Sequence, residues 1–236
     1  MEYQTIFERY ELKYLITPAQ KEKILRAMDP YMALDQYGRT VIRNLYFDTE
    51  NYRVVRKSME RPVYKEKLRI RSYQQTAPDD PVFVELKKKY DSVVYKRRLA
   101  MPLLSAVDWV TGRASCKEQS QIAKEIDYFL QYYQTLRPMA FLSYEREAFY
   151  DKAGGEFRIT FDDNVLFRQD ELSLEAEVGG VPLLGKDQVL MEVKCSGGVP
   201  LWLTRLLSEE KIYKTSFSKY GNAYQNIILP RLKEVA

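Results

Sequence analysis

Lysine and arginine side chains alternate along three consecutive segments between residues 63 and 101. In the first segment, Lys65, Lys67, Arg69 and Arg71 occupy every second position. Because the side chains of an extended strand alternate between its two faces, all four point the same way. Arginine forks match phosphate oxygens bidentately and lysines add point charges, so such a row could bind condensed phosphate. A half-buried sheet whose charges are solvated would show the same alternation.

The second and third segments repeat this pattern. Glu85 and Lys87 share one face of the second segment, opposite a row of apolar residues, and Lys96 and Arg98 share a face of the third. A register shift of one residue would exchange Arg98 for Arg97. Three neighbouring strands would thus each present cations on one side of a sheet.

The same alternation elsewhere in the chain enlarges this set of charged candidates. The cations are Lys13, Lys67, Arg69, Arg71, Lys87, Lys96, Arg98, Arg146, Arg158 and Lys194, and the carboxylates are Glu11, Glu85 and Glu192. Cations gathered inside one fold are costly unless a counter-charge is present, and a polyanionic ligand supplies it. The few carboxylates suit Mg²⁺ or Mn²⁺, which commonly bind through one or two carboxylates together with substrate phosphates. Glu192 could instead pair with Lys194, and Asp162 and Asp163 could simply shape a turn.

Composition excludes several classes of function. The chain has no histidine, which removes histidine-based general bases, Ser–His and Cys–His dyads and imidazole metal ligands. Cys116 and Cys195 lie far apart, which favours a reducing compartment over a disulfide framework. Because the net charge is only +4 and aromatic residues are not interleaved with the cations, we expect no nucleic-acid partner. No segment predicts a membrane span or a signal peptide, so we expect a cytoplasmic protein.

The elements that must position these residues are strands with helices between them. Strands are predicted over 5–16, 41–47, 63–73, 82–90, 93–101, 140–150, 156–165 and 189–197, and a weaker strand pattern covers 165–187. Helices are predicted over 18–29, 48–60, 103–134, 199–212 and 216–232. The short connections favour antiparallel pairing within one domain over residues 1–236. We therefore expect an α+β protein, a closed or nearly closed barrel with a charged interior and helices outside.

Together, these motifs resemble those of a known family. They are ERYELKY, KLRIR, FVELKKK, YKRR, SYEREAF, FRITFDD, MEVK and SFSKY. In this order they resemble the polyphosphate polymerase domain of the vacuolar transporter chaperone (VTC) proteins, a branch of the triphosphate tunnel metalloenzymes (the CYTH group).

The resemblance implies a closed eight-stranded antiparallel barrel, the triphosphate tunnel, which binds ATP or another nucleoside triphosphate and a divalent metal, Mn²⁺ or Mg²⁺. It implies phosphate contacts from Lys13, Arg69, Arg71, Lys87, Lys96, Arg98, Arg146, Arg158 and Lys219. Tyr144 and Ser218 would add hydrogen bonds, Glu192 would hold the metal, and Glu11 or Glu85 could share it. Lys67 and Lys194 are expected to contact substrate from the same face.

One departure from the wider group bears on the reaction. Hydrolytic and cyclase members usually begin with Glu-x-Glu-x-Lys, whereas Arg9 stands at the first of these positions. This favours a polymerase that transfers the γ-phosphate of ATP to phosphate or to a growing polyphosphate chain. The alternatives are a triphosphatase or tripolyphosphatase in the same tunnel, and a non-enzymatic module that binds polyphosphate or inositol phosphates. Phosphoryl transfer needs chiefly positioning and charge neutralisation, which this set of residues provides.

Overall fold

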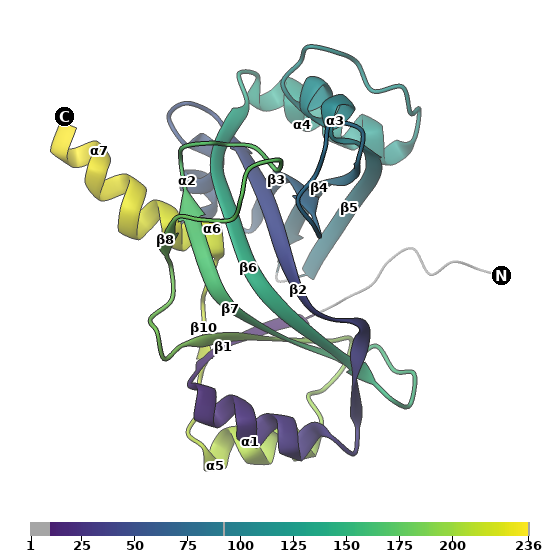
Figure 1. Ribbon diagram of the computed structural model, residues 1–236, viewed down its shortest axis with the longest axis vertical. Helices are drawn as coiled ribbons and strands as arrows, with labels where there is room; N and C mark the ends of the chain where they lie inside the picture. Colours follow the sequence, from purple (N-terminus) through teal and green to yellow (C-terminus); the bar gives the residue numbers. More distant parts are fainter. Residues whose placement is uncertain (1–9, 92, 236) are drawn as a thin grey trace.

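The computed structural model describes residues 10–91 and 93–235 of the chain. Its strands are β1 (Tyr10–Ile16), β2 (Met32–Asp48), β3 (Tyr64–Ser72), β4 (Pro81–Tyr90), β5 (Val93–Pro102), β6 (Arg137–Asp151), β7 (Arg158–Arg168), β8 (Val181–Pro182), β9 (Val189–Cys195) and β10 (Lys214–Thr215). Its helices are α1 (Pro18–Met28), α2 (Arg53–Met59), α3 (Leu103–Val110), α4 (Gln121–Tyr133), α5 (Leu201–Glu209), α6 (Lys219–Ala223) and α7 (Leu229–Val235), with the π-helical turn η1 (Tyr224–Ile228) between the last two (Figure 1).

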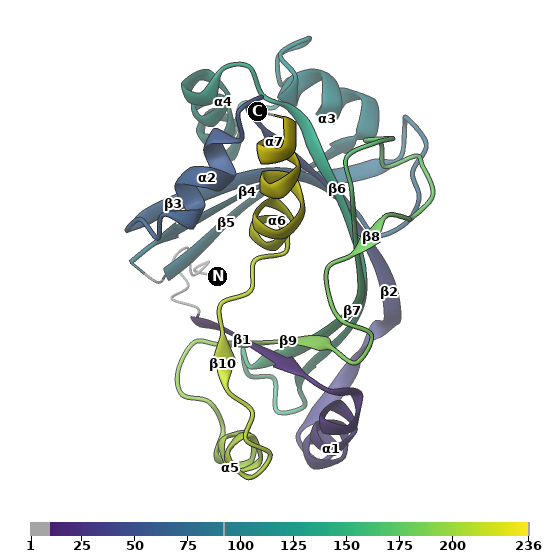
Figure 2. The ribbon, with the colours of Figure 1, turned by 90° about the vertical axis from the view of Figure 1, so that its left-hand side faces the viewer.

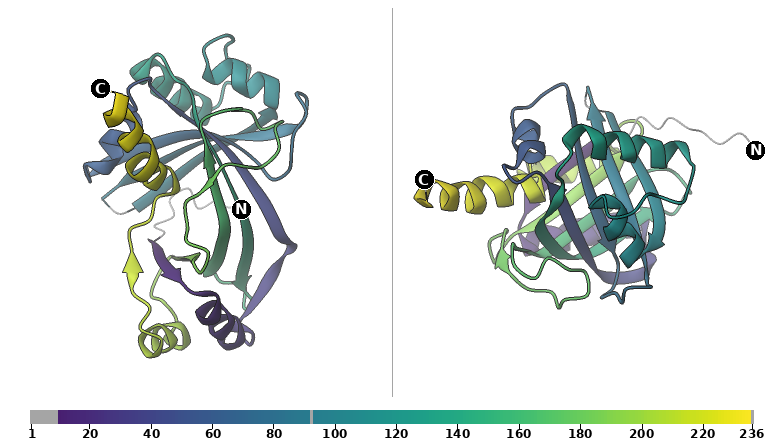
Figure 3. Two further views of the ribbon diagram at one scale, coloured as in Figure 1. Left: turned by 60° about the vertical axis from the view of Figure 1, so that its left-hand side comes forward. Right: turned by 90° about the horizontal axis from the view of Figure 1, so that it is seen from above.

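All the strands belong to one antiparallel sheet, which confirms the predicted α+β class. The strand order is β10, β1, β9, β7, β6, β2, β3, β4, β5, with β8 beside β7. The sheet twists and curls toward one of its faces, called the interior face below (Figure 2, Figure 3). In the described part of the chain, no backbone pairing joins β5 to β1. Closure of the barrel therefore stays a prediction.

Three elements differ from the sequence-based expectation. β2 begins at Met32, well before the predicted start at residue 41, and its first half carries a register shift against β6 and a glycine, Gly38, at φ +60°. The predicted helical region 103–134 divides into α3 and α4. In the region 165–187, where a weak strand was predicted, β7 runs on to Arg168 and only the two residues of β8 form a further strand.

Helices cover the outer face of the sheet, opposite the interior face. At one end, α3 and α4 pack against β3 and β4, where Trp109 and Ile70 belong to the same buried cluster as Leu86. At the other end, α1 and α5 pack against β1, β7 and β9 in a cluster that includes Met191 and Leu203. These two clusters bury the outer side of the sheet. The interior face carries the polar side chains described below and two further apolar clusters, which include Ile42 and Tyr46.

The start of α6 lies against the interior face. The Ser218 side chain caps this helix by accepting a hydrogen bond from the Gly221 backbone, 3.2 Å away. The hydroxyl of Tyr220 donates to the buried carboxylate of Asp48 at 3.1 Å, and Asp48 also accepts backbone amides at the start of α2. The Tyr220 ring stacks on Tyr46, with 5.0 Å between the ring centroids. α2 and α6 are thus fixed to β2, while α7 extends away from the sheet (Figure 1). No helix in residues 10–91 or 93–235 is long and apolar enough to cross a bilayer.

Candidate functional site

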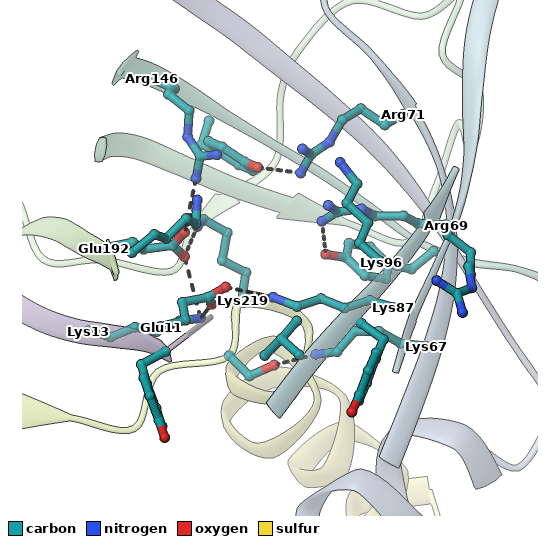
Figure 4. A pocket seen from close by; sticks show the side chains of 18 residues that line it. Glu11, Lys13, Lys67, Arg69, Arg71, Lys87, Lys96, Arg146, Glu192 and Lys219 are labelled. Carbon is teal, nitrogen blue, oxygen red and sulfur yellow. Dashed lines mark hydrogen bonds and ion pairs between the residues drawn. The ribbon is translucent and has the colours of Figure 1, made fainter. Parts of the chain in front are cut away.

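A cavity of about 420 Å³ lies on the interior face, which is within the usual size range of small-ligand pockets. Its charged lining consists of Glu11, Lys13, Lys67, Arg69, Arg71, Lys87, Lys96, Arg97, Arg146, Glu192, Lys194 and Lys219. Tyr10, Tyr46, Tyr95, Tyr144, Val94 and Ser218 complete it. Figure 4 shows side chains from opposite sides of the curled sheet pointing toward one another across this space.

The side of the cavity formed by β3, β4 and β5, called the β3–β5 wall, is organised around Glu85. This carboxylate is only 1% exposed. It accepts hydrogen bonds from the Nε and Nη2 atoms of Arg69 at 2.9 and 2.7 Å, and Lys96 Nζ lies 2.7 Å from it. Arg98 also donates to it through Nε at 2.7 Å. Burial alone would raise the pKa of Glu85, but these cations outweigh burial and hold it well below its usual range.

Arg71 sits deeper in the same wall. Its Nε donates to Asn44 Oδ1 at 2.9 Å, and its Nη2 donates to the Tyr144 hydroxyl at 2.8 Å. The guanidinium of Arg69 similarly donates to the Tyr46 hydroxyl at 2.9 Å. The hydrogen-bond partners of Arg71 are neutral and orient it without cancelling its charge, whereas Arg69 is oriented by the Tyr46 hydroxyl and by the Glu85 carboxylate together.

The opposite side of the cavity, called the β1–β9 wall, comes from β1, β9, β7, β6 and the start of α6. Asp162 on β7 is fully buried and accepts both Nε and Nη2 of Arg146, at 2.5 and 2.6 Å. Lys219 donates to the same carboxylate at 2.5 Å and lies 3.5 Å from Glu192. Burial opposes charge on Glu192, but Lys219 and Lys13 hold the pKa of Glu192 well below its usual range.

Glu11 and Glu192 converge on one lysine of this wall. Lys13 Nζ lies 3.2 Å from a Glu11 oxygen and 3.4 Å from a Glu192 oxygen, and it donates to the Phe217 carbonyl at 2.8 Å. Lys87 reaches across from β4 and donates to Glu11 at 2.9 Å. Despite burial, Glu192 and Glu11 together raise the pKa of Lys13 above its ordinary value. The two walls are therefore joined by an ion pair.

Lys67 differs from the other cavity lysines because, in the part of the chain that the structure describes, it forms no ion pair. Its Nζ contacts the Ser218 hydroxyl at 3.1 Å. Burial and the nearby charges of Lys87 and Lys13 lower the pKa of Lys67 to about 7. Burial likewise lowers the pKa of Lys96 and of Lys194 to about 8, although a carboxylate lies close to each. An incoming polyanion would favour the charged form of all three lysines.

The carboxylates at the cavity could hold a divalent metal only together with phosphate oxygens of a bound substrate. Among residues 10–91 and 93–235, no three acidic or cysteine side chains gather as a metal-binding group. Glu11 and Glu192 nevertheless face the cavity and converge, and two carboxylates completed by phosphate oxygens are a common way to hold Mg²⁺. Glu85 is enclosed by cations and does not line the cavity, so its position does not support a role as a ligand.

Most of the predicted site residues converge on the cavity, and two of the cations do not line it. Arg98 faces the interior opposite Glu85 but lies behind the lining, where its Nη2 donates to the Tyr73 hydroxyl at 2.8 Å. No register shift exchanges it with Arg97, whose Nε donates at 3.1 Å to Glu125 of α4 on the outer side. Arg158, at the start of β7, has a half-exposed side chain 3.5 Å from Asp35. Arg9 lies outside the described residues.

Sequence reasoning missed three residues that hold the site together. Asp162 was left open as a turn residue, yet it lies inside β7 and pairs with Arg146 and Lys219. Asn44 and Tyr46, which orient Arg71 and Arg69, were not singled out. The sequence did offer one signal for Asn44 and Tyr46: they lie two positions apart in a predicted strand and must therefore share a face.

The comparisons with known proteins identify the family. The family model described as the VTC domain matches residues 8–228. No curated protein matches this chain. Among solved structures, a "putative adenylate cyclase" from Bacillus halodurans superposes with a TM-score of 0.55 at 12% identity, covering 93% of this chain and 98% of the other.

A "putative adenylyl cyclase" from Hippeastrum, described as having a dominant triphosphatase activity, gives a TM-score of 0.55 at 15% identity. The alignment covers 92% of this chain and 95% of that one. At such identities the two likenesses speak for the fold alone. Because the family match spans nearly the whole chain, however, the protein belongs to the VTC domain family.

Proposed function

We propose that this protein is a polyphosphate polymerase that transfers the γ-phosphate of ATP, or of another nucleoside triphosphate, to phosphate or to the end of a polyphosphate chain. One observation carries the proposal: the β3–β5 wall carries a single buried carboxylate, Glu85, which four of its cations approach, and so keeps a large excess of positive charge beside the cavity. A condensed phosphate is the ligand whose charge density and oxygen geometry offset that excess best.

The transfer needs little covalent chemistry from the protein. An ionised oxygen of the acceptor phosphate attacks the γ-phosphorus, a new P–O–P bond forms, and the bond to the β-phosphate oxygen breaks so that ADP leaves. The attacking oxygen is already anionic and needs no general base. Arg69 and Arg71 neutralise charge on the transferred group, and Lys13, Lys87, Arg146 and Lys219 hold the phosphates in line.

The remaining cavity residues serve binding. Lys67, Lys96 and Lys194 supply charge along the chain of phosphates, and the hydroxyls of Tyr144 and Ser218 donate hydrogen bonds. Glu192 and Glu11 would hold a Mn²⁺ or Mg²⁺ ion, which would neutralise part of the charge on the phosphate oxygens when bound. The whole of residues 1–236 would act as one catalytic domain.

Incubation of the purified protein with ATP and Mn²⁺, with the products resolved on a polyphosphate-staining gel, tests the proposal. We expect a ladder that requires the metal and is lost in Arg69→Ala and Arg71→Ala. Arg113→Ala is the matched control, because Arg113 does not line the cavity and its exposed side chain bonds Asp108. Free phosphate without a ladder would make the protein a triphosphatase. Bound ATP or polyphosphate without turnover would make it a binding module.

A further inference from the structure

A second pair of buried arginines lies on the outer face of the sheet, away from the cavity. Arg43 on β2 is 8% exposed, and Arg168 on β7 is 7% exposed. Arg43 is one residue out of phase with Asn44, which faces the interior, and Arg168 shares the outer face through its pairing with Phe141, which pairs in turn with Leu45. Neither arginine forms an ion pair with any residue that the structure describes. Two buried cations without carboxylate partners are unusual and call for a physical account.

Arg168 has its hydrogen bonds met by backbone carbonyls. Its guanidinium donates to the carbonyls of Asp170, Glu171 and Glu177 at 3.2, 3.1 and 2.6 Å, and it lies 4.0 Å from the centroid of the Phe141 ring. These contacts fold the connection 169–180 back over the sheet. Arg168 is therefore a structural residue that fixes the conformation of the connection 169–180.

Arg43 has no such partners. Its buried Nε has no hydrogen-bond partner, and no hydrogen bond from its guanidinium to another described residue is present. Ser143 lies directly beside it in register on β6, and the Ser143 hydroxyl is also buried without a partner. Side chains directly opposite each other on neighbouring strands have Cβ atoms about 4.5–5.5 Å apart, so the two side chains that lack partners are neighbours on the outer face.

Two connections lie near Arg43: the β3–β4 connection follows Ser72, which pairs with Arg43, and the connection 169–180 brings the charge of Glu177 near it. The Thr76 amide donates to the Leu174 carbonyl at 3.3 Å, and Gln75 donates to the Glu175 carbonyl at 2.6 Å. These bonds hold the β3–β4 connection beside the connection 169–180, as Figure 2 shows at the right of the view. The Thr76 hydroxyl is a third buried polar group without a partner. Burial lowers the pKa of Arg43, the nearby charge of Glu177 only partly offsets this effect, and the charge of Arg168 adds to it.

We propose that Arg43 and Ser143 form an oxyanion site on the outer face, which binds one phosphate-sized anion separately from the cavity. A guanidinium and an adjacent hydroxyl offer convergent donors to a single tetrahedral oxyanion. The anion would supply the counter-charge that Arg43 lacks and would satisfy its Nε and the Ser143 hydroxyl. Orthophosphate is the simplest ligand of this class.

Calorimetric titration with inorganic phosphate tests the site in the full chain and in two variants. Arg43→Gln removes the outer site, and Arg71→Gln weakens the cavity. We expect wild type to show a binding step that is weakened at least tenfold in Arg43→Gln and is retained in Arg71→Gln. If Arg43→Gln does not fold, Arg43→Lys and Ser143→Ala replace it, and each should weaken the same step several-fold.

Two outcomes would overturn the proposal. In the first, phosphate binds Arg43→Gln, or both substitute variants, as tightly as wild type. In the second, Glu177→Gln lowers the thermal midpoint as much as Arg43→Gln does, and no phosphate-binding step depends on Arg43. The second result would mean that the Glu177 carboxylate swings in as the partner of Arg43 and that no anion site exists.

Discussion

The two walls of the cavity carry very different charge balances. The β3–β5 wall, with Arg98 behind its lining and leaving aside Arg97, which bonds Glu125, carries six cations and one carboxylate, Glu85, which four of the cations approach. The six cations are Lys67, Arg69, Arg71, Lys87, Lys96 and Arg98. The β1–β9 wall places four cations, Lys13, Arg146, Lys194 and Lys219, among three carboxylates, Glu11, Asp162 and Glu192. Figure 4 shows the two sets facing each other. The excess positive charge is thus concentrated on one side.

This difference separates two tasks. The β3–β5 wall can attract and neutralise phosphate oxygens because its charge is not balanced internally. The β1–β9 wall is nearly balanced, and its Glu11 and Glu192 are the carboxylates that could share a divalent cation. A polyanion would therefore gain most of its electrostatic stabilisation from the β3–β5 wall. The following predictions test this division, from the largest expected effect to the smallest.

Loss of Glu85 should destabilise the fold most. Glu85→Gln leaves its cations facing one another without a counter-charge, and breaking a buried ion pair of this kind costs about 3–5 kcal/mol. Urea unfolding measures the loss. Glu50→Gln is the control, because the Glu50 side chain is 80% exposed and its ion pair with Arg137 should contribute about 1 kcal/mol or less.

Added tripolyphosphate should restore more stability to Glu85→Gln than to wild type, since the anion replaces the missing charge. If Glu85→Gln lowers the free energy of unfolding by less than about 1 kcal/mol, the cations of the β3–β5 wall do not need Glu85 as a counter-charge.

The walls should also differ in their contribution to turnover. Arg71→Ala removes a charge-assisted contact at the transferred phosphate, and we expect ATP turnover to fall on the order of 10²–10³-fold. Lys194→Ala acts on the balanced wall and should reduce turnover on the order of tenfold or less. Steady-state rates of ADP release with Mn²⁺ compare the two variants. Equal losses would contradict the division between the walls.

The pH dependence of tripolyphosphate binding should reflect the protonation of Lys67. Its pKa of about 7 in the empty cavity lies below its ordinary value, so a bound polyanion promotes proton uptake above pH 7. Tripolyphosphate affinity should therefore fall as the pH rises from about 7 to 9, by at most about tenfold per pH unit for this proton. In Lys67→Gln the slope should be shallower. Lys88→Gln, which removes an ion pair with Glu125 of α4, should keep the wild-type slope.

The same lysine affects folding with the opposite sign. Because the folded-state pKa of Lys67 is lowered, the unfolded chain binds more protons above pH 7, and the stability of the empty protein should rise from about pH 7 toward pH 10. Thermal unfolding over this range, compared with Lys67→Gln, measures this contribution.

The smallest effect is expected at the start of α6. Ser218→Ala removes the cap of the helix and the contact with Lys67, and should cost about 1 kcal/mol of stability. It should also weaken tripolyphosphate binding by a few-fold. Ser120→Ala removes the comparable cap of α4, far from the cavity, and should lower stability without changing affinity. Equal tripolyphosphate affinities in the two variants would show that the start of α6 does not contribute to binding.

The face of each strand could be predicted from the sequence, but the position of a residue along the strand and its distant partners could not. Alternation placed Arg69 and Arg71 on one face, and both line the cavity. It placed Arg158 on the same face as Asp162, yet Arg158 sits at the start of β7 and reaches Asp35 instead. A period-two pattern indicates which face of the sheet a side chain is on. It does not indicate where along the strand the cavity lies.

Long-range pairing explains the residues that were missed. Asp162 can be buried only because Arg146 and Lys219 neutralise it, and Lys219 is 57 positions away in the chain. Glu85 was expected as an alternative metal ligand because the sequence predicts the strand face on which it lies. The cations that surround it are visible only in the structure. The first half of β2 lacked a regular pattern because Gly38 and a register shift interrupt it.

The place of β5 at the end of the sheet gives its charges a second consequence. An unpaired edge strand is a template for pairing with another chain, and proteins blunt such edges with charged side chains. In residues 10–91 and 93–235, β5 pairs only with β4, and its centre carries Lys96, Arg97 and Arg98 in succession. Part of the cation row that surrounds Glu85 therefore also keeps neighbouring molecules from adding strands to this edge.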